Sequence, residues 1–557
     1  MRERIEPRIM PARAVSPAPR AMPATPRPGG RQAALHGQDG APYDAASLTN
    51  AALADWWPYL GSPDLEINPW RDRIVARVRD LVRNDGWASG AVTALLDSAI
   101  GPDLRLVSKP DWQQLRLAGA AFDSTWAKEF GLAAQAVWRK WALDPGKWCD
   151  LSRQMTAPEI FYVAFRHLLI DGEALAALPW RPDRLGYGQA NYATVLQGID
   201  PDRLSNPHVI FDLKFMRGGV EINRDGAPVA YHIRQAHQGD WFNAPEQWIW
   251  DRIPSETAGR PNIVHCFEGD RFAQHRAAGG IFLPVVARMK MLAQYDKVEL
   301  QAAVINAIFA AFIESPYDPN DVEAALHGDE GLSERNRELR AYQDERVAFH
   351  RERRLKLQDA VIPRLFPGEK IGTVTAARPS SNFEAFEGAV LRNFASAIGA
   401  SYEQVSKDWS KSNYSSARGA LLEAWKTTGR RRNHFTRNFC SPVYGAVLEE
   451  AMDRGELPLP ANAPEFMEAR GAYMAANWMG PGRGWVDPVK EAQAAVIRMD
   501  GGITTLAHEC AEQGLDVEQV IEERAQIIAM WKASGMALPA WAHDVPAAQA
   551  DTKPRAA

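Results

Sequence analysis

The sequence predicts an α+β fold, in which helices pack around a block of short strands. Three observations lead to this prediction. Apolar residues recur at helical spacing from residue 43 to about 170, strand and turn signals dominate 174–268, and helical spacing returns from residue 281. At 557 residues the chain is too long for a single core, so roughly two to four structural regions are expected.

Charge and cysteine content exclude several classes of protein. The net charge is −5, from 64 basic and 69 acidic residues, so the chain does not grip nucleic acid along its whole surface. Any contact with DNA is expected to be local or weak. The four cysteines lie at least 70 residues apart, which excludes a CxxC ligand pair and gives no sign of a disulfide framework. A reducing, cytosolic place of assembly fits this pattern.

No membrane segment is expected. The longest apolar run, 300–313, has 14 residues and includes Gln301 and Asn306, so it is short for a bilayer span. The N-terminal residues include arginines but no apolar core of a signal peptide.

Residues 1–42 have the composition of a disordered basic arm. They contain seven arginines, eight prolines and three acidic residues. The segment is either a passive tail or one that meets DNA or a partner during assembly and is then trimmed. A transit peptide fits less well, because the prolines prevent an amphipathic helix.

Helices are expected from 43 to 170. Asn68-Pro69 is expected to cap one of them. Its inward stripe is Ile74, Val75, Val78, Leu81 and Val82, and its outward arginines, expected to be solvated, are Arg71, Arg73, Arg77, Arg79 and Arg83. A later helix is expected to begin at the capping box Thr156–Glu159 and to end at Asp171-Gly172.

Strands are expected between 174 and 268. The clearest signal is a hairpin at 219–234, whose Asp225-Gly226 turn separates two β-rich arms. Further strands are predicted at 209–215, 248–253 and 262–267.

One long helical pattern follows at 281–313, with an interruption at Pro284. Such a helix would extend on the order of 45 Å. Ser315-Pro316 ends it, and 329–359 then contains eight acidic and eight basic residues. That charged segment is either an ion-paired helical surface or a docking surface for a partner.

The segment 398–454 combines a polar loop, a helix, a cluster of cations and a second helix. A helix is expected from Ser415, with Gly429 as a stop or bend. No carboxylate occurs from Ala424 to Leu448, whereas five cations do: Lys426, Arg430, Arg431, Arg432 and Arg437. The loop could therefore face a polyanion without reading its bases.

The C-terminal part is expected to form three short helices. A Pro/Gly-rich connector occupies 458–488, and Asp487-Pro488 begins the first helix. The second is expected from Thr504 to Gly514, and Asp516 caps the third. Residues 544–557 are predicted to be disordered.

No catalytic motif is recognisable, and neither a cofactor nor a metal is predicted. The phosphate-loop pattern is absent, and GPGRG at 480–484 is not placed between a strand and a helix. His265 beside Cys266 and His508 near Cys510 are too sparse for metal ligation. Adjacent carboxylates such as Glu449-Glu450 point apart on a helix. The sequence therefore argues against an enzyme, although a site assembled from distant residues stays open.

The stretch YEQVSKDWSKSNYSSARGALLEAW, residues 402–425, resembles the lambda-type portal proteins of tailed bacteriophages. Four further segments match in the same order, and the resemblance spans roughly 43–535. These segments are 80–92 followed by Ile100-Gly101, 170–175, the hairpin at 219–233, and 284–303.

The resemblance implies a ring of subunits, usually twelve, at one capsid vertex. Double-stranded DNA would pass through its channel without sequence specificity, terminase would dock on it, and major capsid and head–tail joining proteins would contact it. The chain would act in the virion, after assembly in the host cytoplasm. Twelve copies of a chain with net charge −5 would carry about −60 charges, which disfavours tight phosphate binding.

The family fold has a mixed α/β wing, long stem helices, a clip and a helical C-terminal crown. The expected regions are the arm at 1–42, wing at 43–280, stem helix at 281–315, clip at 316–375, second stem region with tunnel loop and wing return at 376–455, crown at 456–543, and tail at 544–557. The tunnel loop is placed near 399–416.

The candidate nucleic-acid-binding residues are Lys407 and Lys411, with Arg418 in the helix that follows. Arg430, Arg431 and Arg432 are assigned to ion pairs between subunits. Two other functions compete with the portal ring. One is a DNA-processing enzyme, which the missing phosphate loop disfavours, and the other is a different virion connector or scaffold protein.

Overall fold

The computed structural model describes most of the chain between residues 43 and 542. The described residues are 43–308, 312–314, 341, 344, 345, 348, 370–372 and 383–542, without 48, 49, 54, 118, 120, 210, 411, 412, 483, 485 and 486. The predicted arm, nearly all of the predicted clip and the predicted tail lie outside them. The chain divides into two compact units, 1–61 and 62–557. In the first, a short 3-10 helix, η1, spans Asp44–Ala46.

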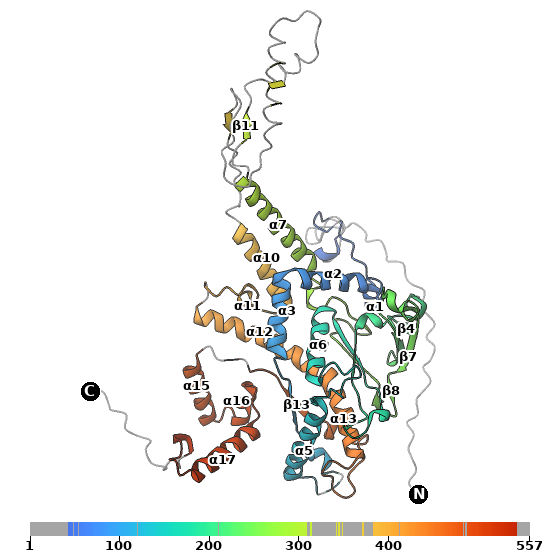
Figure 1. The fold of residues 1–557 in the computed structure, drawn as a ribbon, viewed down its shortest axis with the longest axis vertical. Coiled ribbons are helices and arrows are strands. Elements are labelled where there is room, and N and C mark those ends of the chain that lie inside the picture. The colour runs from blue at the N-terminus through green and yellow to red at the C-terminus, as the bar shows by residue number, and fades with distance from the viewer. Residues whose placement is uncertain are drawn as a thin grey trace, which may run out of the picture. The chain divides into compact units, whose positions relative to one another are not determined.

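Helices form the first part of the larger unit (Figure 1). They are α1 (Pro63–Ile67), α2 (Arg71–Asn84), α3 (Gly86–Ala99), α4 (Trp112–Leu115), α5 (Ser124–Ala142) and α6 (Ala157–Ile170). The capping box that begins α6 at Thr156 and Glu159 is confirmed, as is its end at Asp171. The predicted cap at Asn68 is wrong. Asn68 follows α1, and its amide donates to Asp212 at 2.6 Å instead of capping α2.

Short antiparallel strands form the next block. One sheet has the order β10–β2–β3 and another the order β4–β5–β6–β7. The bounds are β2 (Glu173–Ala177), β3 (Gln197–Ile199), β4 (Met216–Arg217), β5 (Val220–Ile222), β6 (Pro228–Arg234), β7 (Trp250–Pro254), β8 (Glu256–Thr257), β9 (Arg260–Pro261) and β10 (Ile263–Phe267). The 3-10 helices among them are η2 (Pro182–Arg184), η3 (Pro201–Arg203), η4 (Pro207–Val209), η5 (Trp241–Asn243) and η6 (Glu246–Trp248).

The predicted hairpin is confirmed as β5 and β6, with Val220 opposite Tyr231. The strand predicted at 209–215 is wrong for its described residues. There the Asp212 carboxylate accepts hydrogen bonds from the amide of Asn206 and the backbone N–H of Gly218. Such local side-chain bonds favour a loop over a strand.

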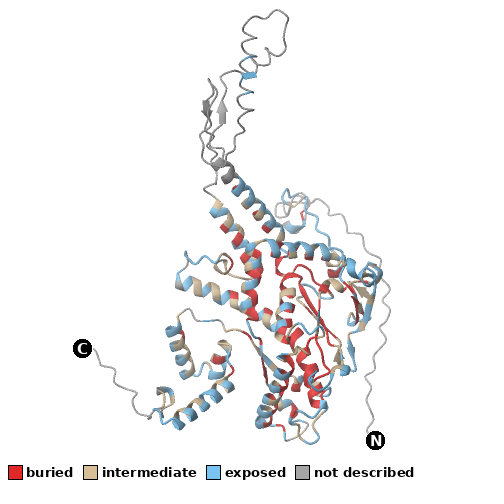
Figure 2. Cartoon of the chain, in the orientation of Figure 1, coloured by how far each residue is buried: buried red, intermediate tan, exposed pale blue. Residues whose placement is uncertain are grey.

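A small sheet joins parts of the chain that are far apart in sequence. Strand β1 (Arg105–Ser108) pairs antiparallel with β13 (Ala476–Met479), Leu106 lying opposite Trp478. Both strands pack against the main core. Buried residues concentrate on α3, α5, α6 and α13 (Figure 2).

Two helices lie side by side after the strand block (Figure 1). They are α7 (Val286–Ile308) and α10 (Phe383–Ile398). Phe282, just before α7, stacks on Phe394 of α10, and Tyr295 of α7 stacks on Phe383 of α10, so the two helices run antiparallel. The predicted helix at 281–313 is therefore too long. A 3-10 turn, η7 (Gly280–Phe282), precedes α7, and β11 (Phe312–Glu314) follows it.

Strand β11 pairs antiparallel with β12 (Lys370–Gly372), Phe312 lying opposite Gly372. The pairing brings residues 370–372 next to residues 312–314. The segment between the two strands is therefore an excursion with adjacent ends.

One continuous helical stretch runs from residue 414 to 453. It consists of α12 (Tyr414–Phe435), a π-helical turn, η8 (Thr436–Cys440), and α13 (Ser441–Asp453). The stop predicted at Gly429 is wrong, since the helix continues through it. Phe435 and Phe439 are both fully buried, and this burial outweighs the weak helix propensity of one glycine. The wide turn precedes Pro442, which has no N–H for the regular ladder.

Short helices complete the described chain. They are α14 (Arg470–Tyr473), α15 (Pro488–Asp500), α16 (Leu506–Glu512), α17 (Val517–Ala533) and η9 (Ala540–Ala542). The caps at Asp487 and Asp516 are confirmed, while α16 is capped by Thr505, one residue beyond the predicted start. None of the described helices is long and apolar enough to cross a membrane.

Candidate nucleic-acid interface and buried ion-pair network

The predicted tunnel loop is held firmly at both ends. Gly399, which ends α10, has φ +71°, and a Cβ there would lie 2.7 Å from Thr427 of α12. Ser401 and Gln404 form a capping box that begins the short helix α11 (Tyr402–Ser406). Its Val405 is buried in the core. The predicted polar loop thus contains a helical turn, and only the residues after it protrude.

Lys407 lies where α11 ends. It adopts a left-handed conformation with φ 57°, and its side chain is exposed. Trp409 beside it is 41% exposed. Asn413 then caps α12 through a second capping box with Ser416. A solvent-exposed cation is therefore presented from a segment fixed at both ends. Lys411, the second predicted cation, lies outside the described residues.

Arg418 lies in a different environment from Lys407. It is half-buried on the first turns of α12 and lines a cavity of about 320 Å³ together with Asp97 and Glu491. The structure therefore does not bring Arg418 and Lys407 into one exposed basic surface. Asp97 and Glu491 add negative charge to the lining of this cavity, which disfavours a phosphate there.

The three consecutive arginines of α12 have three different environments. Arg430 is exposed and forms an ion pair with Glu268. Arg431 is buried and donates to the carbonyl of Ile398 at 2.6 Å. Arg432 donates to the carbonyls of Ala99, Ser98 and Pro481 at 2.7, 2.8 and 3.2 Å.

Burial lowers the pKa of both Arg431 and Arg432. These two guanidinium groups bind their own chain, and only Arg430 keeps an exposed side chain. The ion pairs between subunits predicted for Arg430, Arg431 and Arg432 stay a prediction. Of the three residues, Arg430 is the best candidate, because its side chain is exposed.

Among the described residues, Glu173 at the start of β2 is a charged group with several charged partners. It is fully buried, and Arg276 donates to its two oxygens at 2.5 and 2.9 Å. Arg71 of α2 donates to the same carboxylate at 2.8 Å, and His265 of β10 lies 3.0 Å from it. Burial alone would raise the pKa of Glu173, but the charges of Arg276 and Arg71 hold it well below its usual range.

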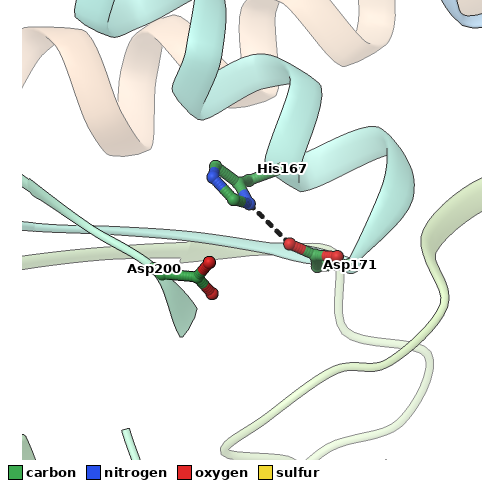
Figure 3. A group of neighbouring side chains, drawn as sticks. All are labelled: His167, Asp171 and Asp200. Atoms are coloured by element: carbon green, nitrogen blue, oxygen red, sulfur yellow. Dashed lines mark hydrogen bonds and ion pairs between the residues drawn. The ribbon is translucent and has the colours of Figure 1, made fainter. Parts of the chain in front are cut away.

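A second cluster lies at the end of α6. His167, Asp171 and Asp200 hold their ligand-type atoms within 4.8 Å of one another (Figure 3). His167 Nδ1 lies 2.5 Å from Asp171, and Arg79 donates to Asp171 at 2.8 Å and to Asp200 at 2.9 Å. Burial would raise the pKa of Asp171, but the hydrogen bonds from His167 and Arg79 lower it. The guanidinium therefore occupies the position between these carboxylates that a cation would take.

The solvated role expected for Arg71 and Arg79 is wrong. Arg71 is only 3% exposed, and Arg79 is tied to three carboxylates through Asp171, Asp200 and Asp202. One signal in the sequence could have shown this. Arg71 lies four residues before Val75 and seven before Val78, which places it on the apolar stripe of its own helix.

Residues 49–432 match the family described as phage portal protein, lambda family. The chain belongs to this family. It is 31% identical over 492 residues to portal protein B of Escherichia phage lambda, covering 88% of this chain and 90% of that protein. It is 32% identical over 493 residues to the portal protein of Escherichia phage N15, again covering 88% and 90%. The family predicted from residues 402–425 and the four ordered segments is confirmed, as is the α+β fold.

Solved structures also resemble this portal-family chain. One is the neck of a native gene transfer agent particle computed with C12 symmetry, with 15% identity, coverage of 74% of this chain and 95% of that chain, and a TM-score of 0.34. Another is an HK97-family phage portal protein from Corynebacterium diphtheriae, with 13% identity, coverage of 66% and 85%, and a TM-score of 0.25. These similarities concern single chains, and the assembly of this chain is not inferred from them.

Proposed function

We propose that copies of this chain close into a ring, with twelve as the expected number, at one vertex of a phage capsid. Double-stranded DNA enters and leaves the capsid through the bore of this ring. The family match over residues 49–432 carries the proposal. The ring acts in the virion and assembles in the host cytoplasm.

The distribution of charge supports a bore that does not hold DNA. Phosphate binding strengthens with each phosphate that a protein neutralises. In the described part of the predicted loop, Lys407 is the exposed cation, and Arg418, after the loop, lines a cavity that two carboxylates also line. A few weak contacts let the duplex slide, whereas a continuous basic groove would stall it.

The antiparallel pair α7 and α10 supports a stem, because the two helices pack against each other through aromatic side chains. The β11–β12 pairing closes the segment between them into one excursion, which we assign to the clip. We further propose that terminase docks on the clip, and that major capsid and head–tail joining proteins contact other faces. In this arrangement the motor supplies ATP hydrolysis and the ring itself catalyses nothing.

Arg430 is the strongest candidate for an ion pair between neighbouring copies. It is exposed, it lies on a long helix, and its partner Glu268 is itself 39% exposed, so the pair is accessible to a neighbour's charges. Arg431 and Arg432 then fix α12 to its own subunit and hold Arg430 in place.

Electron microscopy and mass photometry of the purified protein test this function. We expect closed particles with a central hole and a mass near twelve times 61.8 kDa. Only monomers at high concentration, with capsid components present, would contradict the ring. Metal-dependent cleavage of DNA or turnover of ATP by the purified chain would favour a DNA-processing enzyme instead.

A further inference from the structure

A cavity lined by both charged and apolar residues, away from the predicted tunnel loop, has no role in the proposed function. It has a volume of about 590 Å³ and lies among the end of α1, the start of α2, the loop before β4 and the end of β6. Cavities of this size accept small molecules or single side chains of a partner. Four arginines line it, namely Arg71, Arg217, Arg234 and Arg276, against two carboxylates, Asp72 and Asp212.

Arg234 differs from the other buried arginines of the cavity. It is the last residue of β6 and is 6% exposed. Its guanidinium lies over the Trp250 ring, 4.9 Å from the centroid. Its Nε is buried without a hydrogen-bond partner, and no described carboxylate lies within ion-pair distance of it, although the charge of Asp72 acts on it from further away. By contrast, Arg71 and Arg276 are both bound to Glu173.

A second orphaned polar atom lies in the same cavity. The Asn68 amide donates through Nδ2 to Asp212, but its Oδ1 is buried and accepts no hydrogen bond from the described residues. Two residues of the cavity lining, Arg234 and Asn68, thus each have a buried polar atom without a hydrogen-bond partner among the described residues. At the rim of the cavity, the aromatic side chains of Phe211 and Trp248 are 88% and 58% exposed.

We propose that this cavity binds the carboxylate of an acidic protein segment that carries an aromatic or apolar residue beside the acid. A guanidinium matches the planar geometry of a carboxylate through two parallel hydrogen bonds. The exposed rings of Phe211 and Trp248 cover the apolar neighbour of that acid.

Duplex DNA fits this cavity less well than a peptide. A concave site of this volume admits one side chain, whereas a duplex presents a line of phosphates on a convex surface. The carboxylates of Asp72 and Asp212 in the lining would repel a run of phosphates. Arg234 is a single buried cation, so it matches a single anionic group better than a run of phosphates.

The energetics explain why such an arginine indicates a ligand. A buried charge without a partner opposes folding, and an apolar side chain of similar volume is often neutral or stabilising in its place. Arg234 therefore brings a penalty to the unliganded protein, and a bound carboxylate removes it.

Calorimetry on the full-length protein tests the proposal with three probes. They are a blocked tetrapeptide Gly-Phe-Glu-Gly, the same peptide with glutamine in place of glutamate, and inorganic phosphate at matched ionic strength. We expect the glutamate peptide to bind and the glutamine peptide to bind at least about tenfold more weakly. Arg234→Met should weaken the glutamate peptide by a similar factor.

Arg224→Met is the matched control, since Arg224 is an exposed arginine in the β5–β6 turn. It should leave peptide binding unchanged. Equal binding of the two peptides, or binding of neither, would overturn the proposal and leave a hydrated cavity. Phosphate binding more tightly than the glutamate peptide would also overturn it, in favour of a phosphate ligand.

Thermal unfolding without ligand separates a binding role from a packing role. If Arg234 is retained for a ligand, Arg234→Met should unfold at the same temperature as the wild type or higher. A marked loss of stability would show that the contact with Trp250 is structural and would count against the proposal. If the variant does not fold, the comparison of glutamate and glutamine peptides on the wild-type protein decides.

Discussion

The arginines of α2 and Lys407, in the turn before α12, lie in opposite environments. The sequence predicts Arg71 and Arg79 on a solvated helix face, yet both are bound to carboxylates in or near the core. It also assigns Lys407 to a tunnel loop that contacts DNA, and Lys407 is exposed on a turn, with no ion pair among the described residues. In the first region, charge holds secondary-structure elements together. In the second, it is left available for a ligand.

The difference shows that the environment of a basic side chain can be predicted only when the carboxylates that pair with it are known. Apart from Asp72, which is adjacent to Arg71, the acids that bind Arg71 and Arg79 lie more than 90 residues further along the chain, namely Asp171, Glu173, Asp200 and Asp202. No acid lies in sequence between Ala424 and Leu448, so the arginines there bind carbonyl oxygens or distant acids instead.

The largest expected effect is the loss of the central carboxylate of the α2 network. Glu173→Gln leaves Arg276 and Arg71 buried with an uncompensated charge, so the free energy of unfolding should fall by about 3–5 kcal/mol. Chemical denaturation at fixed protein concentration measures it. The matched control is Glu423→Gln, which removes an exposed pair with Lys426 and should change stability by about 0–1 kcal/mol. Equal losses of stability in the two variants would contradict the idea that the buried carboxylate matters more than the exposed one.

Acid should weaken the same network. The folded-state pKa values of Glu173 and Asp171 lie below their ordinary values of 4.5 and 3.8, so the unfolded chain binds more protons in this range. The stabilisation is complete above the ordinary values and is lost as pH falls through the lower folded-state values. Denaturation midpoints should therefore drop steeply below about pH 4.5. Glu173→Gln should flatten that dependence, and an unchanged slope would argue against the pairing.

A smaller effect, of opposite sign, is expected in α12. A Cβ at Gly429 meets nothing within 4 Å, and the residue lies inside a continuous helix. Gly429→Ala should therefore raise the free energy of unfolding by roughly 0.5–1 kcal/mol. Gly280→Ala serves as the contrasting control, because its Cβ would approach the Leu169 carbonyl to 2.1 Å at φ +48°. Destabilisation by Gly429→Ala would show that the helix bends there after all.

The smallest effect on stability is expected at Lys407. Lys407→Ala should change the free energy of unfolding by less than about 0.5 kcal/mol, because the side chain is exposed. Its effect should appear in DNA binding by the assembled ring. The slope of log affinity against log salt should become shallower by about 0.9 for each phosphate that the variant ring no longer neutralises. Arg224→Ala, in the β5–β6 turn, should leave the slope unaltered.

Local signals in the sequence predict much of the fold. The Asp225-Gly226 turn and the capping residues Thr156 and Asp487 act over a few residues, and each element they indicate is present. The errors arise where distant contacts override local preference. Gly429 looks like a helix stop until the burial of Phe435 and Phe439 is known. Asn68 looks like a cap until Asp212, far along the chain, takes its amide.

The candidate site is predictable in part for the same reason. Lys407 protrudes because the turn around it is set by neighbours in sequence, which local pattern can reveal. The environments of Arg431 and Arg432 depend on the carbonyls of Ile398 and Ala99, and nothing near them in sequence indicates those partners. The orphaned Arg234 could not be foreseen, because its isolation is a property of the whole cavity.

The pairing of β1 with β13 can form only late in synthesis of the polypeptide. Residues 105–108 leave the ribosome long before their partner at 476–479 has been made. At a synthesis rate of roughly 5–20 residues per second, that interval lasts on the order of tens of seconds. During this time β1 presents unpaired backbone groups to every neighbouring chain. Truncation before residue 476 removes the partner of β1, so such a chain should aggregate more than the full-length protein.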